Sequence, residues 1–304
     1  MTRDGASLHP ASSSELGARD REPDSSRGPG SLDRTAFVLS GGGSLGAVQV
    51  GMLHALLEAG IRPDLVVGSS VGAINGAFLA GHASLQGVEQ LATLWESIRR
   101  RDVFPLGLRA VLGGALGRRA HFVDPLALRT LILRAELGFS RLEEAPVPFY
   151  PVATDLATGD AVVLREGDTV EALLASAAIP GVFPPVEIRG RMLVDGGVVA
   201  DSPLTQAEAL GATIIYLLPT ASAEDAVLPA GAIDIAARAM FLSASQAAEA
   251  TVAELATRLE VHVVPPPGAS SHSIFEFGLT TELIDGGYLR TLGWLEERSS
   301  TLVA

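Results

Sequence analysis

Residues 35–57 read TAFVLSGGGSLGAVQVGMLHALL, and this stretch decides the fold. A short apolar run typical of a buried strand comes first and ends in Gly41-Gly42-Gly43. The apolar residues that follow recur with helical spacing: Leu45, Val48, Met52, Leu53, Leu56 and Leu57. The order strand, glycine loop and helix is typical of an α/β fold.

The same order returns in residues 64–81, which read DLVVGSSVGAINGAFLAG. An apolar strand is followed by Ser69-Ser70 and then by a helix of small residues that can pack closely on a sheet. Further strands are predicted at FYPVATD, DAVVLRE, RMLVD, TIIYLL and LEVHVV, which begin at residues 149, 160, 191, 213 and 259. Because helical segments lie between several of them, the sequence predicts a largely parallel sheet covered on both faces.

The composition limits the classes of function that the chain can have. Its 304 residues are 47% hydrophobic and 19% charged, the balance of a globular protein with a sizeable core. With 22 Arg, no Lys and 35 acidic residues the net charge is −13, so we expect no nucleic-acid partner. Because there is no cysteine, an enzyme on this chain has to use oxygen chemistry.

The two regions of the chain differ in character. Residues 1–33 are rich in Ser, Gly, Asp, Arg and Pro without periodicity, so we predict a flexible tail before a domain over residues 34–304. The tail has no apolar core of a secretory signal, and the longest apolar run, residues 65–81, is interrupted by Gly, Ser and Asn. We therefore expect a cytoplasmic protein, with peripheral contact to a membrane as the alternative.

Residues 99–119 form a locally cationic stretch, with six arginines and one aspartate around an apolar interior. One interpretation is a surface insert with solvated arginines. The other is a cap or lid over about residues 99–135 that contacts lipid near the functional site. The sequence does not decide between them.

Gly68-Ser69-Ser70-Val71-Gly72 matches G-x-S-x-G, in which a serine stands on a strained turn between a strand and a helix. With 33 glycines in the chain, an ordinary glycine-rich turn is the simpler interpretation. The apolar strand directly before and the helix directly after favour the catalytic interpretation. We predict Ser70 as the nucleophile.

The segment Gly41-Gly42-Gly43-Ser44-Leu45-Gly46 also ends a strand and begins a helix, so its amides can converge on an anion. It matches the dinucleotide pattern G-x-G-x-x-G as well, but that fold needs an acidic residue at the end of the second strand. Here the second strand ends in Ser69-Ser70. We therefore predict an oxyanion hole formed by Gly41, Gly42 and Gly43.

Asp195 stands at the end of the predicted strand RMLVD and is followed by two glycines. Taken alone, this pattern is typical of an Asp-Gly turn. As the base for a serine, Asp195 needs a desolvated site, because an ordinary aspartate with a pKa near ~3.9 is too weak a base. Asp155 is expected to shape a hairpin, and Asp201-Ser202-Pro203 is expected to begin a helix with Asp201 or Ser202 as the N-cap.

Together, the three motifs in this order resemble the patatin-like phospholipases. VATDLATGD and ASAAIPGVFPPVEIRGRMLVDGGVVADSPL also resemble that family, over roughly residues 35 to 220, and FGLTTELIDGGYLRTL resembles its closing helix. The resemblance implies a three-layer α/β/α sandwich and a Ser70–Asp195 dyad without histidine. It further implies hydrolysis of acyl esters of phospholipids or related lipids, with no cofactor and no metal. Many members carry Arg or Lys where this chain has Leu45.

Two alternatives remain open at this stage. His262 and His272 follow Ser70 and Asp195 in the order of an α/β-hydrolase triad, although Ser70 follows the second strand, which is early for that fold. The other alternative is a lipid-binding or regulatory protein that has the fold without turnover. Transient contact with a membrane surface is compatible with both. The lipid, its acyl position and chain length, and the oligomeric state do not follow from the sequence.

Overall fold

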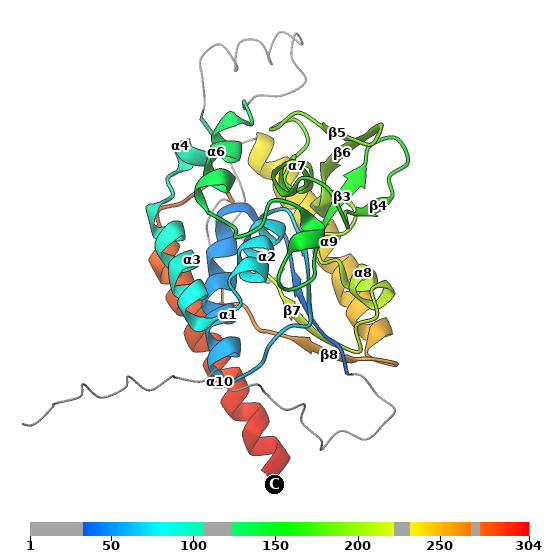
Figure 1. The fold of residues 1–304 in the computed structure, drawn as a ribbon. Coiled ribbons are helices and arrows are strands. Elements are labelled where there is room, and N and C mark those ends of the chain that lie inside the picture. Colours follow the sequence, from blue (N-terminus) through cyan, green and yellow to red (C-terminus); the bar gives the residue numbers. More distant parts are fainter. Residues whose placement is uncertain (1–32, 106–122, 222–231, 269–273, 304) are drawn as a thin grey trace, which may run out of the picture. The chain divides into compact units, whose positions relative to one another are not determined.

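The computed structural model describes residues 33–105, 123–221, 232–268 and 274–303. All but the last residue of the predicted tail, and residues 106–119 of the cationic stretch, lie outside these ranges. The strands are β1 (Thr35–Leu39), β2 (Leu65–Ser69), β3 (Phe149–Asp155), β4 (Ala161–Val163), β5 (Val186–Ile188), β6 (Arg191–Asp195), β7 (Ile214–Leu218) and β8 (Glu260–Val263). They form one eight-stranded sheet in the order β5-β6-β3-β2-β1-β7-β8, with β4 paired to β3 (Figure 1).

Five neighbouring strands, β3, β2, β1, β7 and β8, run parallel to one another. Ala36 of β1 lies between Leu65 of β2 and Ile215 of β7, so β1 occupies the centre of the sheet. The predicted parallel sheet is confirmed for these strands. An antiparallel extension, in which β6 pairs with β3 and β5 with β6, completes one edge, and β5 is a strand that the sequence did not indicate.

Helices cover both faces of the sheet, so the expected three-layer α/β/α sandwich is confirmed (Figure 1). The helices on one side are α1 (Ala47–Glu58), α2 (Val71–Gly81), α3 (Leu85–Ser97), α4 (Arg100–Val103), α6 (Leu126–Arg134), α7 (Thr169–Ser176) and α10 (Thr280–Val303). On the other side lie α8 (Leu204–Ala209) and α9 (Ala232–Leu255). Among the described residues, no helix is long and apolar enough to cross a membrane.

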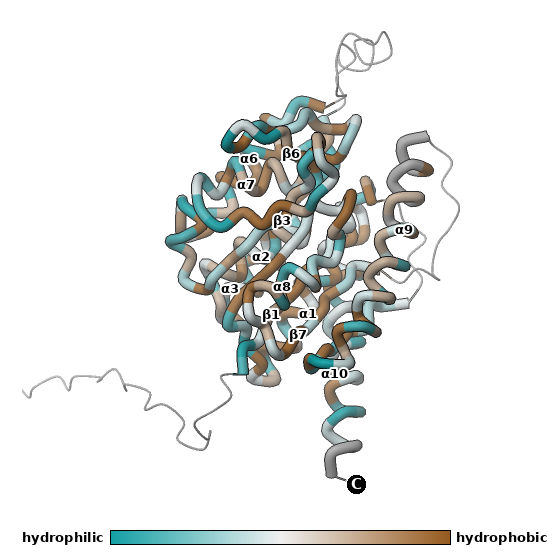
Figure 2. The backbone as a smooth tube through the Cα atoms, turned by 90° about the vertical axis from the view of Figure 1, so that its right-hand side faces the viewer, coloured by the Kyte–Doolittle hydropathy of each residue, from teal (hydrophilic) through white to brown (hydrophobic). Residues whose placement is uncertain are grey.

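The side chains of β1 alternate between two hydrophobic cores. Phe37 and Leu39 belong to the core under α1, α2 and α3, whereas Ala36 and Val38 belong to the core shared with α8 and with Leu255 of α9. Both faces of the central strands are thus buried, which explains why β1 and β2 are nearly continuous apolar runs rather than alternating ones. Figure 2 shows hydrophobic colour along β3, whereas α10 alternates between hydrophilic and hydrophobic turns.

Helices α1 and α10 pack backbone against backbone. A Cβ atom added at Gly51 of α1 would lie 2.0 Å from the carbonyl oxygen of Ile284, and one added at Gly287 of α10 would lie 2.3 Å from the carbonyl oxygen of Val48. A side chain at either position would force the two helices apart. The closing helix expected from the sequence is present, and these glycines determine how closely it packs.

We predict opposite effects for two glycine substitutions in α10. Gly287→Ala should lower the free energy of unfolding by about 1–3 kcal/mol, since the new methyl group would overlap the backbone of α1. Gly293→Ala should raise it by about 0.5–1 kcal/mol, because nothing lies within 4 Å of that position and alanine favours the helix. Urea unfolding of both variants measures the difference. Equal effects would contradict the close packing of α1 and α10.

Candidate active site

Ser70 stands on a strained turn between β2 and α2. Its backbone dihedrals are φ 54° and ψ −126°, a conformation that costs free energy for a residue with a side chain. The flanking glycines are required by close backbone contacts: a Cβ at Gly68 would lie 2.5 Å from the oxygen of Gly72, and one at Gly72 would lie 2.3 Å from the oxygen of Leu39. This is the geometry of a nucleophile elbow, in which the serine hydroxyl projects from the turn.

Asp195 accepts a hydrogen bond from the hydroxyl of Ser70. The distance from Ser70 Oγ to Asp195 Oδ2 is 2.6 Å, and the other carboxylate oxygen accepts from the amide of Gly197 at 2.7 Å. Both side chains are buried, with Ser70 7% and Asp195 4% exposed. Strand β6 pairs with β3 at Ala153↔Asp195. This pairing in the sheet places the Asp195 carboxylate beside Ser70.

Burial raises the pKa of Asp195 to about 6, since removal from water disfavours the charged carboxylate. The hydrogen bonds from Ser70 and Gly197 oppose this change and keep the pKa from rising further. Asp195 therefore lies in a desolvated site. A carboxylate with a pKa of about 6 is ionised at neutral pH and is a better proton acceptor than an ordinary aspartate.

Asp201 is a second acid at this site, and the expectation that it caps a helix is wrong. Helix α8 begins at Leu204 with Pro203 at the N-cap position, and no side chain bonds to the cap. Instead, a Cβ added at Gly197 would lie 3.0 Å from Asp195 Oδ1 and 3.2 Å from Asp201 Oδ1, so the two carboxylates flank the same glycine. Burial, and next the charge of Asp195, raise the pKa of Asp201 to about 7.

The glycine loop curves past Ser70 in a conformation that only glycine adopts readily. Gly42 and Gly43 have φ values of 146° and 58°. A Cβ at Gly42 would lie 2.2 Å from Thr220 Oγ1, and one at Gly43 would lie 2.5 Å from the carbonyl oxygen of Ile274. Backbone freedom and close packing therefore both demand glycine at these two positions.

The three loop amides differ in what they bind. The amide of Gly41 donates to the carbonyl oxygen of Asp201 at 3.2 Å. Among the turn, loop and cap hydrogen bonds of the described residues, none is donated by the amides of Gly42 or Gly43. These two N–H groups are the ones available to a ligand. Gly41 itself lies against Ser70, since a Cβ at this position would be 3.3 Å from Ser70 Cβ.

Ser176 is a further residue of the site that the sequence reasoning missed. Its hydroxyl accepts a hydrogen bond from the amide of Ser70 at 3.1 Å and donates to the carbonyl oxygen of Val152 at 2.6 Å. Ser176 thereby links the serine turn to β3. Its position at the end of α7, inside the segment ASAAIPG, gives no local signal of this role.

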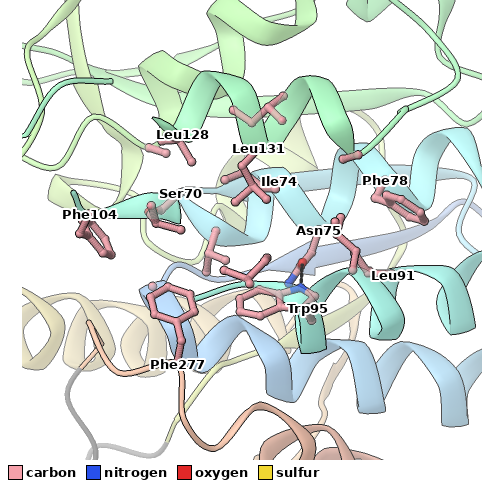
Figure 3. Close-up of a pocket in the computed structure, with 18 of the residues that line it drawn as sticks. Ser70, Ile74, Asn75, Phe78, Leu91, Trp95, Phe104, Leu128, Leu131 and Phe277 are labelled. Atoms are coloured by element: carbon pink, nitrogen blue, oxygen red, sulfur yellow. Dashed lines mark hydrogen bonds between the residues drawn. The ribbon is translucent and has the colours of Figure 1, made fainter. Parts of the chain in front are cut away.

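An apolar cavity extends from Ser70 between α2, α3 and α6 (Figure 3). Helix α2 contributes Ile74 and Phe78, α3 contributes Leu91 and Trp95, and α6 contributes Leu131. The walls expose almost only carbon atoms. Such a cavity favours a hydrophobic ligand whose reactive group reaches Ser70.

The other residues named from the sequence lie elsewhere. His262, on β8, packs between the rings of Tyr216 and Trp294, and its Nε2 lies 2.6 Å from a carboxylate oxygen of Glu260. It contacts neither Ser70 nor Asp195, whereas His272 falls outside the described residues. Asp155 ends β3 at the β3–β4 hairpin and accepts from the amide two residues further on, as expected for a turn.

A comparison with family models identifies the chain. The model described as patatin-like phospholipase matches residues 37–208. The chain belongs to the patatin-like phospholipase family. The matched segment of this patatin-like protein contains the glycine loop, the serine turn and Asp195. The resemblance carried by the three motifs is confirmed.

Curated relatives and solved structures extend the comparison. An uncharacterized NTE family protein of Mycobacterium tuberculosis is 33% identical over 174 residues, which are 57% of this chain and 45% of the relative. Lysophospholipase NTE1 of Pyricularia oryzae is 25% identical over 283 residues, 86% of this chain and 18% of the relative. This patatin-like protein thus spans less than half the length of these two relatives. VipD from Legionella pneumophila has a TM-score of 0.46 and 13% identity, covering 87% of this chain and 67% of VipD.

We predict that Asp195 makes the fold less stable as the pH rises. Below its ordinary pKa of 3.8 the carboxyl group is protonated in both states; between about pH 4 and pH 6 the unfolded chain loses the proton first, so the free energy of unfolding falls. The two-unit difference corresponds to about 3 kcal/mol. Asp195→Asn should abolish a fall of about this size in the free energy of unfolding. Asp201→Asn should abolish a second fall in the free energy of unfolding, which extends to slightly higher pH.

Urea unfolding of the wild type and both variants at about pH 4 and pH 8 measures this difference. The matched control is Asp160→Asn, at an exposed position in the β3–β4 turn, which should leave the pH dependence unchanged. If Asp195→Asn retains the full pH dependence of the wild type, Asp195 is not desolvated.

Proposed function

We propose that this protein is a serine hydrolase of lipid acyl esters, of the phospholipase A, lysophospholipase or esterase type. One observation carries the proposal: the Ser70 hydroxyl donates to a buried carboxylate at 2.6 Å, at one end of an apolar cavity. The family membership of the chain supports the same activity. A nucleophile with its base beside a hydrophobic cavity suits an ester whose acyl part is hydrocarbon.

In the first step, Asp195 takes the proton of Ser70 as Oγ attacks the carbonyl carbon of the ester. The amides of Gly42 and Gly43 stabilise the negative charge that develops on the carbonyl oxygen. The tetrahedral intermediate then collapses, the bond to the alcohol breaks, and the proton held by Asp195 passes to the leaving alcohol or lyso-lipid. Ser70 now carries the acyl group as an ester.

In the second step, Asp195 accepts a proton from a water molecule that attacks the acyl-enzyme. The same two amides stabilise the second oxyanion. When this intermediate collapses, the proton returns to Ser70 Oγ and the fatty acid is released. Asp195 therefore serves as base and then as acid in both halves of the reaction, a role that its pKa of about 6 suits at neutral pH.

The described part of the cationic stretch supports its interpretation as a cap. Phe104, directly after α4, and Leu128 and Leu131 of α6 line the cavity, so both ends of the stretch over residues 99–135 contribute to its wall. On the outer side of α6, Leu126 and Leu133 are 64% and 61% exposed. Exposed leucines beside arginines suit transient contact with a lipid surface.

Loss of either member of the dyad should abolish most turnover. We expect Ser70→Ala and Asp195→Asn each to lower kcat for a chromogenic ester by at least about 10³-fold, and the double variant to be no worse than the more damaging single one. The two groups act as a unit, so their effects do not add. His262→Ala serves as the control and should retain kcat, because its side chain bonds elsewhere. Near-normal kcat in either dyad variant would refute the mechanism.

A lipid-binding protein without turnover is the alternative, and covalent labelling separates the two. A fluorophosphonate should modify Ser70 of the folded wild type and leave Ser70→Ala unmodified, because only an activated serine attacks such a reagent. Mass spectrometry of the tryptic peptide locates the adduct. Folded wild type that binds lipid vesicles but takes up no label would favour the binding protein.

A further inference from the structure

The apolar cavity follows one face of helix α2 away from the nucleophile. Val71, Ile74, Asn75 and Phe78 line it, at the spacing of residues on one side of a helix. With a rise of 1.5 Å per residue, the distance along α2 from Ser70 to Phe78 is about 12 Å. Figure 3 shows Ser70 and Phe78 on opposite sides of the cavity, with Ile74 between them. The cavity is therefore elongated along α2.

Beyond Phe78 the protein is closed. Phe78 is 5% exposed, and its ring stacks on the ring of His82 with 4.7 Å between the ring centroids. One turn after Phe78, a Cβ added at Gly81 would lie 1.8 Å from the carbonyl oxygen of Leu137, so the end of α2 touches neighbouring backbone directly. The side chain of Phe78 thus closes this end of the cavity, and the backbone contact between Gly81 and Leu137 lies behind it.

Asn75 offers no polar surface to a ligand, because the residue is 0% exposed and its side-chain amide bonds within the protein. Its Nδ2 donates to the carbonyl oxygen of Gly46 and to Gln49 Oε1, each at 2.9 Å, and its Oδ1 accepts from Trp95 Nε1 at 2.8 Å. The other described lining residues between Ile74 and Phe78 along the cavity are hydrocarbon or aromatic. A polar group on a ligand at this depth would be left without a partner.

We infer that this cavity holds the acyl chain of the substrate extended along α2, and that Phe78 limits its length. The enzyme accordingly selects unsubstituted hydrocarbon chains. Its kcat/KM increases with acyl chain length only up to about decanoyl, the chain that spans the distance from Ser70 to Phe78. The inference rests on the proposed function, because it assumes an acyl group attached to Ser70. It adds a specificity-determining residue, Phe78, and a class of acyl group.

The burial of methylene groups gives the inference a quantitative form. Each methylene that enters the cavity leaves water, which should raise kcat/KM by up to about fourfold. We expect kcat/KM for p-nitrophenyl esters to rise at each step from butanoyl to octanoyl and to stop rising near decanoyl. Longer chains meet Phe78 and gain nothing. All esters are used below the concentration at which they aggregate.

We call the chain length at which kcat/KM stops rising the break point. Variants of the cavity should move it in opposite directions. Phe78→Ala opens space at the far end, so the rise should continue to dodecanoyl or myristoyl, whereas Ile74→Phe should stop it near hexanoyl. Phe78→Leu, which removes less buried surface, tests the same point if Phe78→Ala fails to fold. The matched control is Leu289→Ala at an exposed position of α10, which does not line the cavity and should leave the break point unchanged.

A second measurement tests the absence of polar partners. A terminal hydroxyl on the decanoyl chain should lower kcat/KM at least about tenfold relative to decanoyl itself, because the hydroxyl loses water and gains no partner. A flat chain-length series, a break point that Phe78→Ala and Phe78→Leu both leave in place, or equal rates for the hydroxylated chain would overturn this inference. In those cases hydrolysis by Ser70 still stands. Failure of every ester, together with no fluorophosphonate label on Ser70, would instead refute the proposed function.

Discussion

The buried hydrogen bond between Ser70 and Asp195 is the contact on which the rest of the proposed site depends. The two residues are 125 positions apart, and they meet because β6 returns antiparallel beside β3 while β3 lies next to β2. The same burial that raises the pKa of the carboxylate would be costly without partners, which the Ser70 hydroxyl and the Gly197 amide supply. The order of the strands therefore creates both the contact and the basicity.

Local pattern was enough to predict the centre of the sheet and the turn at Ser70. Helices cover both faces of β1 and β2, so these strands are nearly continuous apolar runs, and that signal is visible in the sequence. Gly68 and Gly72 are fixed by backbone atoms within a few residues of the turn or on the adjacent strand. Each of these requirements involves atoms close to the strand or the turn. Each is therefore visible as a local sequence motif.

The features that the sequence did not reveal depend on tertiary contacts. β5 is only three residues long and partly exposed, so it has no periodicity to detect. Asp201-Ser202-Pro203 is typical of a helix start, yet Pro203 takes the cap position and Asp201 turns toward Asp195. The role of Ser176 and the closed end of the cavity at Phe78 arise only when separate helices pack together. No local pattern distinguishes such residues from ordinary core or loop positions.

The central place of β1 also determines the order in which the protein can assemble. On the ribosome, β1 emerges before the other strands of the described sheet, and its first partner, β2, follows within about 30 residues of it. The other edge of β1 stays unpaired until β7 is made, because Thr35 pairs with Ile214 across almost 180 intervening residues. Until then an apolar strand edge stays open to wrong partners, a known route to aggregation. Nascent chains that stall before β7 therefore leave this edge of β1 without its partner strand.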